Sequence, residues 1–213
     1  MTPKQGRRSS APGVRGISAV RLPPGIGNGP AGQLRPATEQ VRLSYVAALR
    51  EYQAEGLYPD LNPVALSDPA AFRAYVHRIR QAADSSVQLP PGWVPESTFW
   101  WIAQDRYLGR LAIRHRLTPA LQRRGGHIGF DVRPSARNQG CAKRMLMAAL
   151  PHAARLGLEH ALLTCDVDNL ASQRVIFACG GELIDRTDGI LRFTLRTSVD
   201  PATTGEHLGE THP

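Results

Sequence analysis

Residues 126–146, Gly-His-Ile-Gly-Phe-Asp-Val-Arg-Pro-Ser-Ala-Arg-Asn-Gln-Gly-Cys-Ala-Lys-Arg-Met-Leu, decide the fold of this chain. They predict a short apolar strand, then a basic turn of small residues, then a helix. Backbone N–H groups in the first turn of a helix have no partner within the helix and lie at the positive end of its dipole. The sequence therefore predicts an anion site suited to a phosphate or pyrophosphate, where Gly140 allows close approach to the backbone.

Helix and strand patterns alternate on both sides of this segment. Before it, the patterns predict a short strand near Leu34, helices over 41–56 and 69–79, and strands over 98–103, 108–115 and 125–133. After it, they predict a helix over 140–157, a strand over 160–167, a helix over 169–179, and strands over 182–186 and 190–196. Antiparallel strands combined with a helix-connected strand predict an α+β fold with a mixed sheet.

Composition indicates one globular domain with loose ends. The chain has 213 residues, of which 42% are apolar and 21% charged, a balance typical of globular proteins. Residues 1–32 are basic and rich in Gly and Pro, so we expect a disordered tail. Residues 33–196 form the predicted domain, and residues 197–213 are expected to form a second disordered tail.

Charge, hydropathy and cysteine usage exclude several classes of protein. The net charge of +8 is spread along the chain, with +5 in residues 1–40 and −3 in residues 197–213, and aromatic residues do not alternate with the basic ones. This pattern argues against nucleic acid as a partner. No apolar run is long enough to span a membrane, and no signal peptide is recognised, so we expect a cytoplasmic protein. The three cysteines predict neither disulfides nor a metal site.

One hexapeptide resembles a known cofactor signature. Arg137-Asn138-Gln139-Gly140-Cys141-Ala142, preceded by Val132-Arg133-Pro134, is similar to the acyl-CoA motif Gln/Arg-x-x-Gly-x-Gly/Ala of the GNAT N-acetyltransferase superfamily. Further segments at separations typical of that family are 125–130, 163–166, 168–172 and 180–183. The resemblance covers about residues 33–196.

The resemblance implies a fold and a cofactor. The fold would be a single GNAT domain, with a mixed, mostly antiparallel sheet whose central parallel strands, 125–133 and 160–167, splay apart to bind acetyl-CoA between flanking helices. The pyrophosphate would lie on the N–H groups of the 137–142 turn, and the pantetheine arm along Val132. The residues expected to contact acetyl-CoA are Val132, Arg137, Asn138, Gln139, Gly140, Cys141, Ala142, Lys143 and Asn169. A capping role for Asn169 is compatible with this contact.

The resemblance also implies transfer of the acetyl group to a primary amine by direct attack in a ternary complex. The amine must lose a proton, and His127 and Asp166 are the candidate bases, with His115 ranked below them. Each has a structural alternative: His127 as a core histidine, Asp166 as a turn residue. Arg114 or Arg116 would bind an acidic substrate. The tyrosine that serves as general acid in many relatives is replaced by Ile176.

Two other functions are compatible with the sequence. The missing tyrosine, and the absence of a strand glutamate at 128–129, favour a catalytically inactive CoA-binding regulatory or interaction module as the alternative. A nucleic-acid-associated protein led by its basic tail predicts salt-dependent binding that is lost on deletion of residues 1–36. The acceptor is not specified by any motif. A homodimer is our expectation for the assembly.

Overall fold

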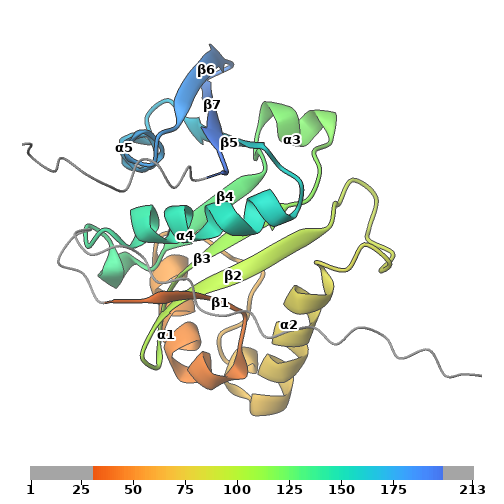
Figure 1. The fold of residues 1–213 in the computed structure, drawn as a ribbon. Helices are drawn as coiled ribbons and strands as arrows, with labels where there is room; N and C mark the ends of the chain where they lie inside the picture. Colours follow the sequence, from red (N-terminus) through yellow and green to blue (C-terminus); the bar gives the residue numbers. More distant parts are fainter. Residues whose placement is uncertain (1–30, 199–213) are drawn as a thin grey trace, which may run out of the picture.

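The computed structural model describes residues 31–198. The predicted tails, 1–32 and 197–213, lie outside these residues except for positions 31, 32, 197 and 198, and they stay predictions. Seven strands and five α-helices are present in the described range, in the order that Figure 1 shows. Together they give the predicted α+β class.

The strands are β1 (Gln33–Pro36), β2 (Glu96–Ala103), β3 (Arg106–Arg114), β4 (Ile128–Val132), β5 (His160–Asp166), β6 (Glu182–Thr187) and β7 (Ile190–Arg196). The helices are α1 (Arg42–Ala54), α2 (Pro69–Gln81), α3 (Pro119–Arg123), α4 (Cys141–Arg155) and α5 (Leu170–Ala178). Three 3-10 turns complete them, η1 (Glu39–Val41), η2 (Ala65–Ser67) and η3 (Pro134–Ala136).

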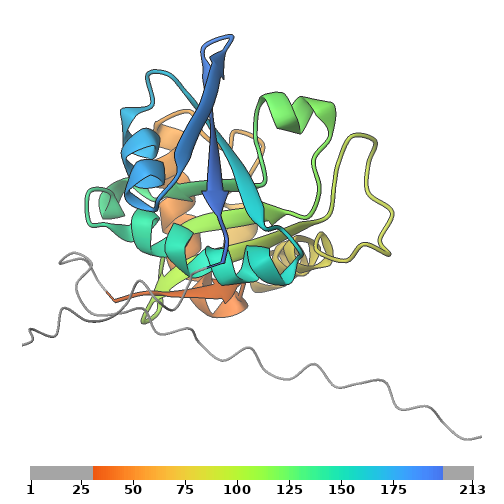
Figure 2. The same cartoon turned by 45° about the horizontal axis from the view of Figure 1, so that its top comes forward.

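The strands form two antiparallel sheets. One has the order β1-β2-β3-β4 and the other the order β5-β7-β6. The first sheet lies between α4 on one face and α1 with α2 on the other, while α5 lies beside the second sheet (Figures 1 and 2). The last two strands are joined by Asp188 and Gly189, both at positive φ, as the Asp-Gly hairpin signal predicts.

Both faces of the first sheet are buried because β2 carries large apolar side chains on each. Trp101 belongs to a core with α4 and α5, and neighbouring Trp100 to a second core with α1 and α2. Successive residues of a strand point to opposite faces, so the run Phe99–Ala103 fills both cores. The two cores fix α1 and α4 on opposite sides of β4.

The strands β4 and β5 approach each other without forming a ladder between the two sheets. The N–H of His127 donates to the carbonyl oxygen of Leu162 at 2.7 Å, just before β4 begins. At Gly126, with φ of 64°, an added Cβ would lie 2.4 Å from that same carbonyl oxygen, so this close approach requires glycine. The observed β4 is shorter than the predicted strand 125–133, because the left-handed turns at Gly125 and Gly126 end the extended backbone there.

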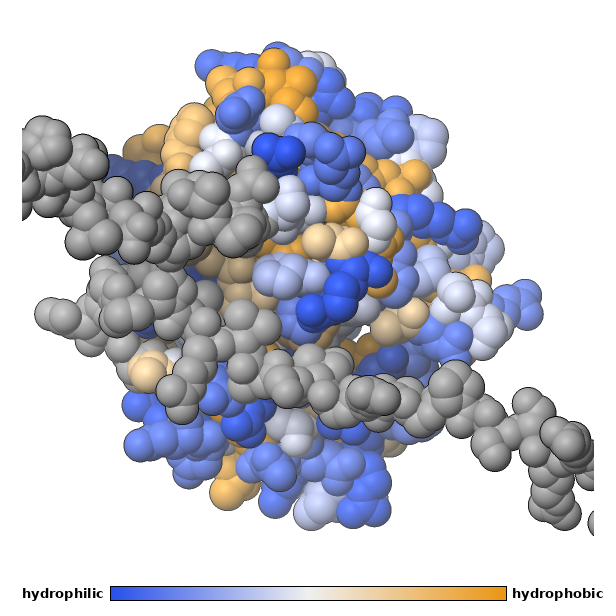
Figure 3. All heavy atoms as spheres, viewed as in Figure 1, coloured by the Kyte–Doolittle hydropathy of each residue, from blue (hydrophilic) through white to orange (hydrophobic). Residues whose placement is uncertain are grey.

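The surface of the described residues is polar over most of the face in Figure 3, with an apolar group at the top of the view, over β6. Leu183 and Ile184 of β6 are 49% and 52% exposed. Between residues 31 and 198, no helix combines the length and hydropathy needed to cross a bilayer.

Candidate functional site

The turn at residues 137–142 leads into α4 through two left-handed residues. Asn138 has φ of 59°, and Gly140, the N-cap, has φ of 70° and ψ of 9°. A glycine cap has no side-chain acceptor for the first-turn N–H groups of α4. The predicted anion site therefore falls at the N-terminus of a 15-residue helix.

A cavity of about 530 Å³, which we call the outer cavity, opens over this turn. It gathers every residue expected to contact the cofactor except Gln139. Asn169 reaches it from the N-cap of α5, where its Oδ1 accepts the N–H of Ser172 at 3.0 Å. The capping role of Asn169 and a position on the cavity wall thus coexist.

Glu51 of α1 and Glu55, the residue that caps its C-terminus, hold the segment that leads into the turn. Glu51 accepts hydrogen bonds from the guanidinium of Arg133 and, at 3.0 Å, from the N–H of Ser135. Burial alone would raise the pKa of Glu51, but these bonds outweigh it and lower the pKa from 4.5 to about 2. One helical turn later, Glu55 forms a two-pronged ion pair with Arg137 at 2.8 and 2.6 Å. Helix α1 therefore fixes the turn from outside.

The basic residues around the turn have different partners. Arg137 is held by Glu55 and also donates to the carbonyl oxygen of Val132 at 3.1 Å. Arg144 is buried and donates to the carbonyl oxygen of Gln139 at 2.8 Å, so it fixes the turn from inside. Lys143 and Arg174 line the outer cavity together with Arg137.

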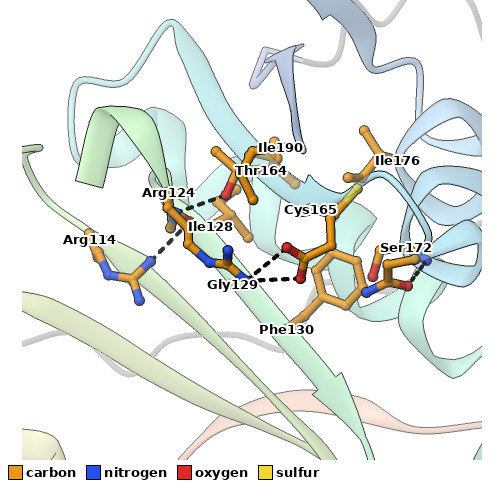
Figure 4. A pocket seen from close by; sticks show the side chains of 14 residues that line it. Arg114, Arg124, Ile128, Gly129, Phe130, Thr164, Cys165, Ser172, Ile176 and Ile190 are labelled. Carbon is orange, nitrogen blue, oxygen red and sulfur yellow. Dashed lines mark hydrogen bonds and ion pairs between the residues drawn. The ribbon is translucent and has the colours of Figure 1, made fainter. Parts of the chain in front are cut away.

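A second cavity of about 290 Å³, the inner cavity, lies between β4 and β5 (Figure 4). Residues 128–130 of β4 form one wall, and residues 163–166, at the end of β5, form the other. Phe130, Asn169 and Ser172 line both cavities, so the two spaces adjoin. Ile176, the residue that the sequence resemblance puts at the position of the tyrosine acid, lines the inner cavity.

The candidate base Asp166 lies on the wall of the inner cavity. Its carboxylate forms an ion pair with Arg124 at 2.8 and 3.0 Å, and Figure 4 shows the Arg124 side chain reaching across the cavity. Asp166 is thus the candidate base that lines the inner cavity. No sequence pattern indicates a role for Arg124, which follows a helix of only five residues.

The other candidate base, His127, is held by the backbone. Its Nδ1 accepts the N–H of Leu162 at 2.9 Å, so the neutral ring carries its proton on Nε2. Burial, together with the nearby Arg114, lowers the pKa of His127 below 6.5. His115 bonds to Ser97 through Nε2 at 2.8 Å. Neither histidine lines the outer or the inner cavity as the described residues define them.

Opposite α4, the side chain of Asp131 links β4 to the loop after α1. It accepts the hydroxyl of Tyr58, and its Oδ2 lies 3.8 Å from Nε of Arg110. Burial raises the pKa of Asp131 above 3.8, although Arg110 and Tyr58 favour its charged form. Tyr58 has φ of 54°, a left-handed backbone that this bond helps to hold.

Several lining residues are not among those that the sequence singles out for contact with the cofactor. Ser172, Arg174 and Val175 project from α5 into the outer cavity, and Phe130 and Asp131 border it from β4. Spacing along α5 places 171, 172, 174 and 175 on adjoining faces of one helix, but nothing local indicates that this side meets β4.

Residues 37–182 match the family model described as an acetyltransferase (GNAT) domain. Comparison with curated proteins gave no significant match.

Solved structures that share the fold include three acetyltransferases with a bound form of coenzyme A. RimL, a ribosomal L7/L12 alpha-N-protein acetyltransferase in complex with coenzyme A, is 17% identical with a TM-score of 0.53, covering 81% of this chain and 96% of its own. RimJ of Mycobacterium smegmatis, in complex with CoA-disulfide, is 17% identical with a TM-score of 0.57, covering 78% and 81%. The microcin C7 self-immunity acetyltransferase MccE, in complex with acetyl-CoA and AMP, is 9% identical with a TM-score of 0.53, covering 78% and 92%.

Proposed function

Because this chain belongs to the GNAT acetyltransferases, a family of enzymes, we propose that it is an N-acetyltransferase that moves an acetyl group from acetyl-CoA to a primary amine. The observation that carries the proposal is the outer cavity, which opens on the N-terminus of α4 and adjoins an inner cavity between β4 and β5. The related RimL and MccE structures contain coenzyme A and acetyl-CoA, respectively.

In this proposal the 137–142 turn binds the pyrophosphate of acetyl-CoA. The N–H groups from Gln139 to Ala142 supply the hydrogen bonds, and Lys143 neutralises charge from the rim. A single charge at a helix N-terminus gains only about 0.3–1 kcal/mol, so several converging hydrogen bonds must provide the affinity. Arg137 and Asn138 border the phosphates.

The pantetheine arm extends along Val132 toward the inner cavity. There it lies between β4 and β5, which in this proposal are the parallel strands that splay apart. Support comes from the single main-chain bond at His127 and the space beyond it, lined by residues 128–130 and 163–166. Asn169, at the junction of the two cavities, contacts the arm with its free amide group. A backbone N–H near Val132 polarises the thioester carbonyl.

Transfer is direct attack of the amine nitrogen on the thioester carbon, with release of the CoA thiolate. Asp166 is the base we favour, because it lines the inner cavity, whereas His127 uses its Nδ1 to accept a backbone N–H. With Ile176 at the usual acid position, the thiolate leaves without a side-chain proton donor and is protonated by water.

Calorimetric titration with acetyl-CoA tests the cofactor assignment, and release of free CoA with a panel of amines tests transfer. Asp166→Asn is expected to lower kcat by about 10²–10⁴-fold, the usual contribution of a positioned base. Asp168→Asn is the matched control, because Asp168 precedes the same helix but lines neither cavity described above. A parental rate and pH profile in Asp166→Asn would exclude Asp166 as the base.

The alternative is a catalytically inactive CoA-binding module, which the apolar residue at position 176 favours. It predicts tight binding of acetyl-CoA with no acetylation of any amine. Both functions therefore predict binding of acetyl-CoA in the titration, and only the enzyme predicts release of free CoA with an amine. A homodimer stays our prediction for the assembly, with light scattering as its measurement.

A further inference from the structure

The inner cavity has more positive than negative side chains on its wall. Its charged lining residues are Arg114, Arg124 and Asp166. Arg114 is fixed in place, because its Nη1 donates to the carbonyl oxygens of Gly125 and Gly126 at 3.2 and 3.0 Å. Its Nε lies 3.3 Å from a carboxylate oxygen of Glu96, which offsets its charge. Arg114 thus holds the wall of the cavity rather than a ligand.

Arg124 and Asp166 have no such second anchor in the described contacts. They form one ion pair, with side chains 68% and 46% exposed. An exposed pair of this kind contributes about 0–1 kcal/mol, so separating its partners costs little. The pair joins the loop after α3 to the end of β5 across the cavity, as the dashed lines to Arg124 in Figure 4 show.

We propose that the acceptor is an amine that carries a carboxylate a few bonds from its nitrogen. Such a zwitterion replaces the internal ion pair with two of its own: its ammonium group binds Asp166 and its carboxylate binds Arg124. A guanidinium and a carboxylate form two parallel hydrogen bonds, which fixes the orientation of the acceptor. This inference rests on the proposed acetyl transfer, since Asp166 then receives the proton of the bound ammonium.

The charge balance disfavours acceptors with several positive groups. A polyamine bound at Asp166 would bring a further ammonium group toward Arg124, and these like charges repel. The volume of about 290 Å³ admits a small molecule or the end of a chain rather than a folded surface. The carboxylate comes either from a free amino acid or from an acidic residue at a peptide N-terminus.

Two matched pairs of acceptors test the inference. Alanine and alaninamide probe a free amino acid, whereas Asp-Ala-amide and Asn-Ala-amide probe an acidic N-terminus. We expect kcat/KM to be at least tenfold higher for the acid in one of the pairs, which identifies the source of the carboxylate. For the first pair, a preference for alanine would oppose intrinsic reactivity. The amine of alaninamide is less basic, so at neutral pH more of it is unprotonated and able to attack the thioester.

A pair of variants assigns the preference to one side chain. Arg124→Gln is expected to reduce the acid-to-amide ratio of kcat/KM by at least tenfold, whereas Arg123→Gln leaves the ratio within twofold. Both changes remove one positive charge from the end of α3, but only Arg124 lines the inner cavity. General attraction of anions to this surface would therefore affect both variants alike.

The outcomes separate this inference from the proposed function. Acetylation with no acid preference in either pair, or equal effects of the two substitutions, overturns the inference and leaves acetyl transfer in place. Binding of acetyl-CoA with no acetylation of any amine overturns the proposed function and the acceptor class with it.

Discussion

At position 140 the backbone takes φ of 70°, which residues other than glycine adopt at a cost of about 1–2 kcal/mol. We predict that Gly140→Val lowers the affinity for acetyl-CoA at least tenfold, because it strains the turn that we propose binds the pyrophosphate and puts a Cβ 3.5 Å from Nη1 of Arg144, which holds that turn. Calorimetric titration measures this change.

Gly157 supplies the matched control for that substitution. It follows α4 at its other end, has φ of 81°, and an added Cβ there would meet nothing within 4 Å. Gly157→Val therefore carries a similar backbone strain and should keep the parental affinity. Equal losses in the two variants would mean that general destabilisation, rather than the turn, weakens binding.

His127 makes the fold sensitive to acid. Its pKa is lowered in the folded protein by burial and by Arg114, so below about pH 6.5 the unfolded chain binds more protons than the folded one. The stabilisation is complete above that pH and is lost as the pH falls through the lowered folded value. We predict a smaller free energy of unfolding at about pH 5.5 than at about pH 7.5, measured with urea.

His127→Asn is the informative variant, since Asn Oδ1 takes the place of Nδ1 and still accepts the N–H of Leu162. The stability of this variant should depend less on pH than that of the parent. If His127 has only a structural role, the variant should also retain acetyl transfer. An unchanged pH dependence would assign the effect to His115 and His152, whose pKa values burial also lowers.

Among the elements, α1 has the most far-reaching contacts. Arg133 is only 8% exposed, so removing Glu51 leaves a buried charge without its carboxylate. We predict that Glu51→Ala costs about 3 kcal/mol of unfolding free energy, whereas Glu55→Ala, which frees the more exposed Arg137, costs less than about 1 kcal/mol. Urea unfolding compares the two. Similar losses of unfolding free energy in the two variants would show that the burial of Arg133 does not determine the cost of removing its carboxylate partner.

The elements show what sequence patterns can and cannot predict. For long periodic segments such as α1, α2 and α4, the patterns predict bounds close to those observed, and Asp68 caps α2 as its position before Pro69 indicates. The five residues of α3 are too few to show a period. The ion pairs of α1 join positions 82 residues apart, and no local pattern encodes such a distance.

For the whole molecule, cofactor binding should appear as added stability. A ligand that binds only the folded state at about 100 times its Kd adds about 2.7 kcal/mol. For a domain of this size we predict that saturating acetyl-CoA raises Tm by roughly 5–10 °C, measured by calorimetry. CoA without the acetyl group should stabilise nearly as much, since the pyrophosphate contacts are common to both. No shift with either compound would contradict the cofactor assignment.

The 137–142 motif singles out most of the residues that line the outer cavity on the α4 side, whereas Arg124 of the inner cavity has no signal in the sequence. The 137–142 turn is contiguous along the chain, so its motif is recognisable from the amino acids alone. Arg124 and Asp166 meet only because β4 and β5 approach at His127 and Leu162. Their pairing follows from tertiary contacts that a single sequence does not display.

The bracing of the turn by α1 also limits how this protein can be rebuilt. Exchanging the 133–142 segment with that of a relative would separate Arg133 and Arg137 from the carboxylates of Glu51 and Glu55. A functional chimera must therefore exchange α1, its C-cap Glu55 and residues 133–142 together, although they lie far apart along the chain.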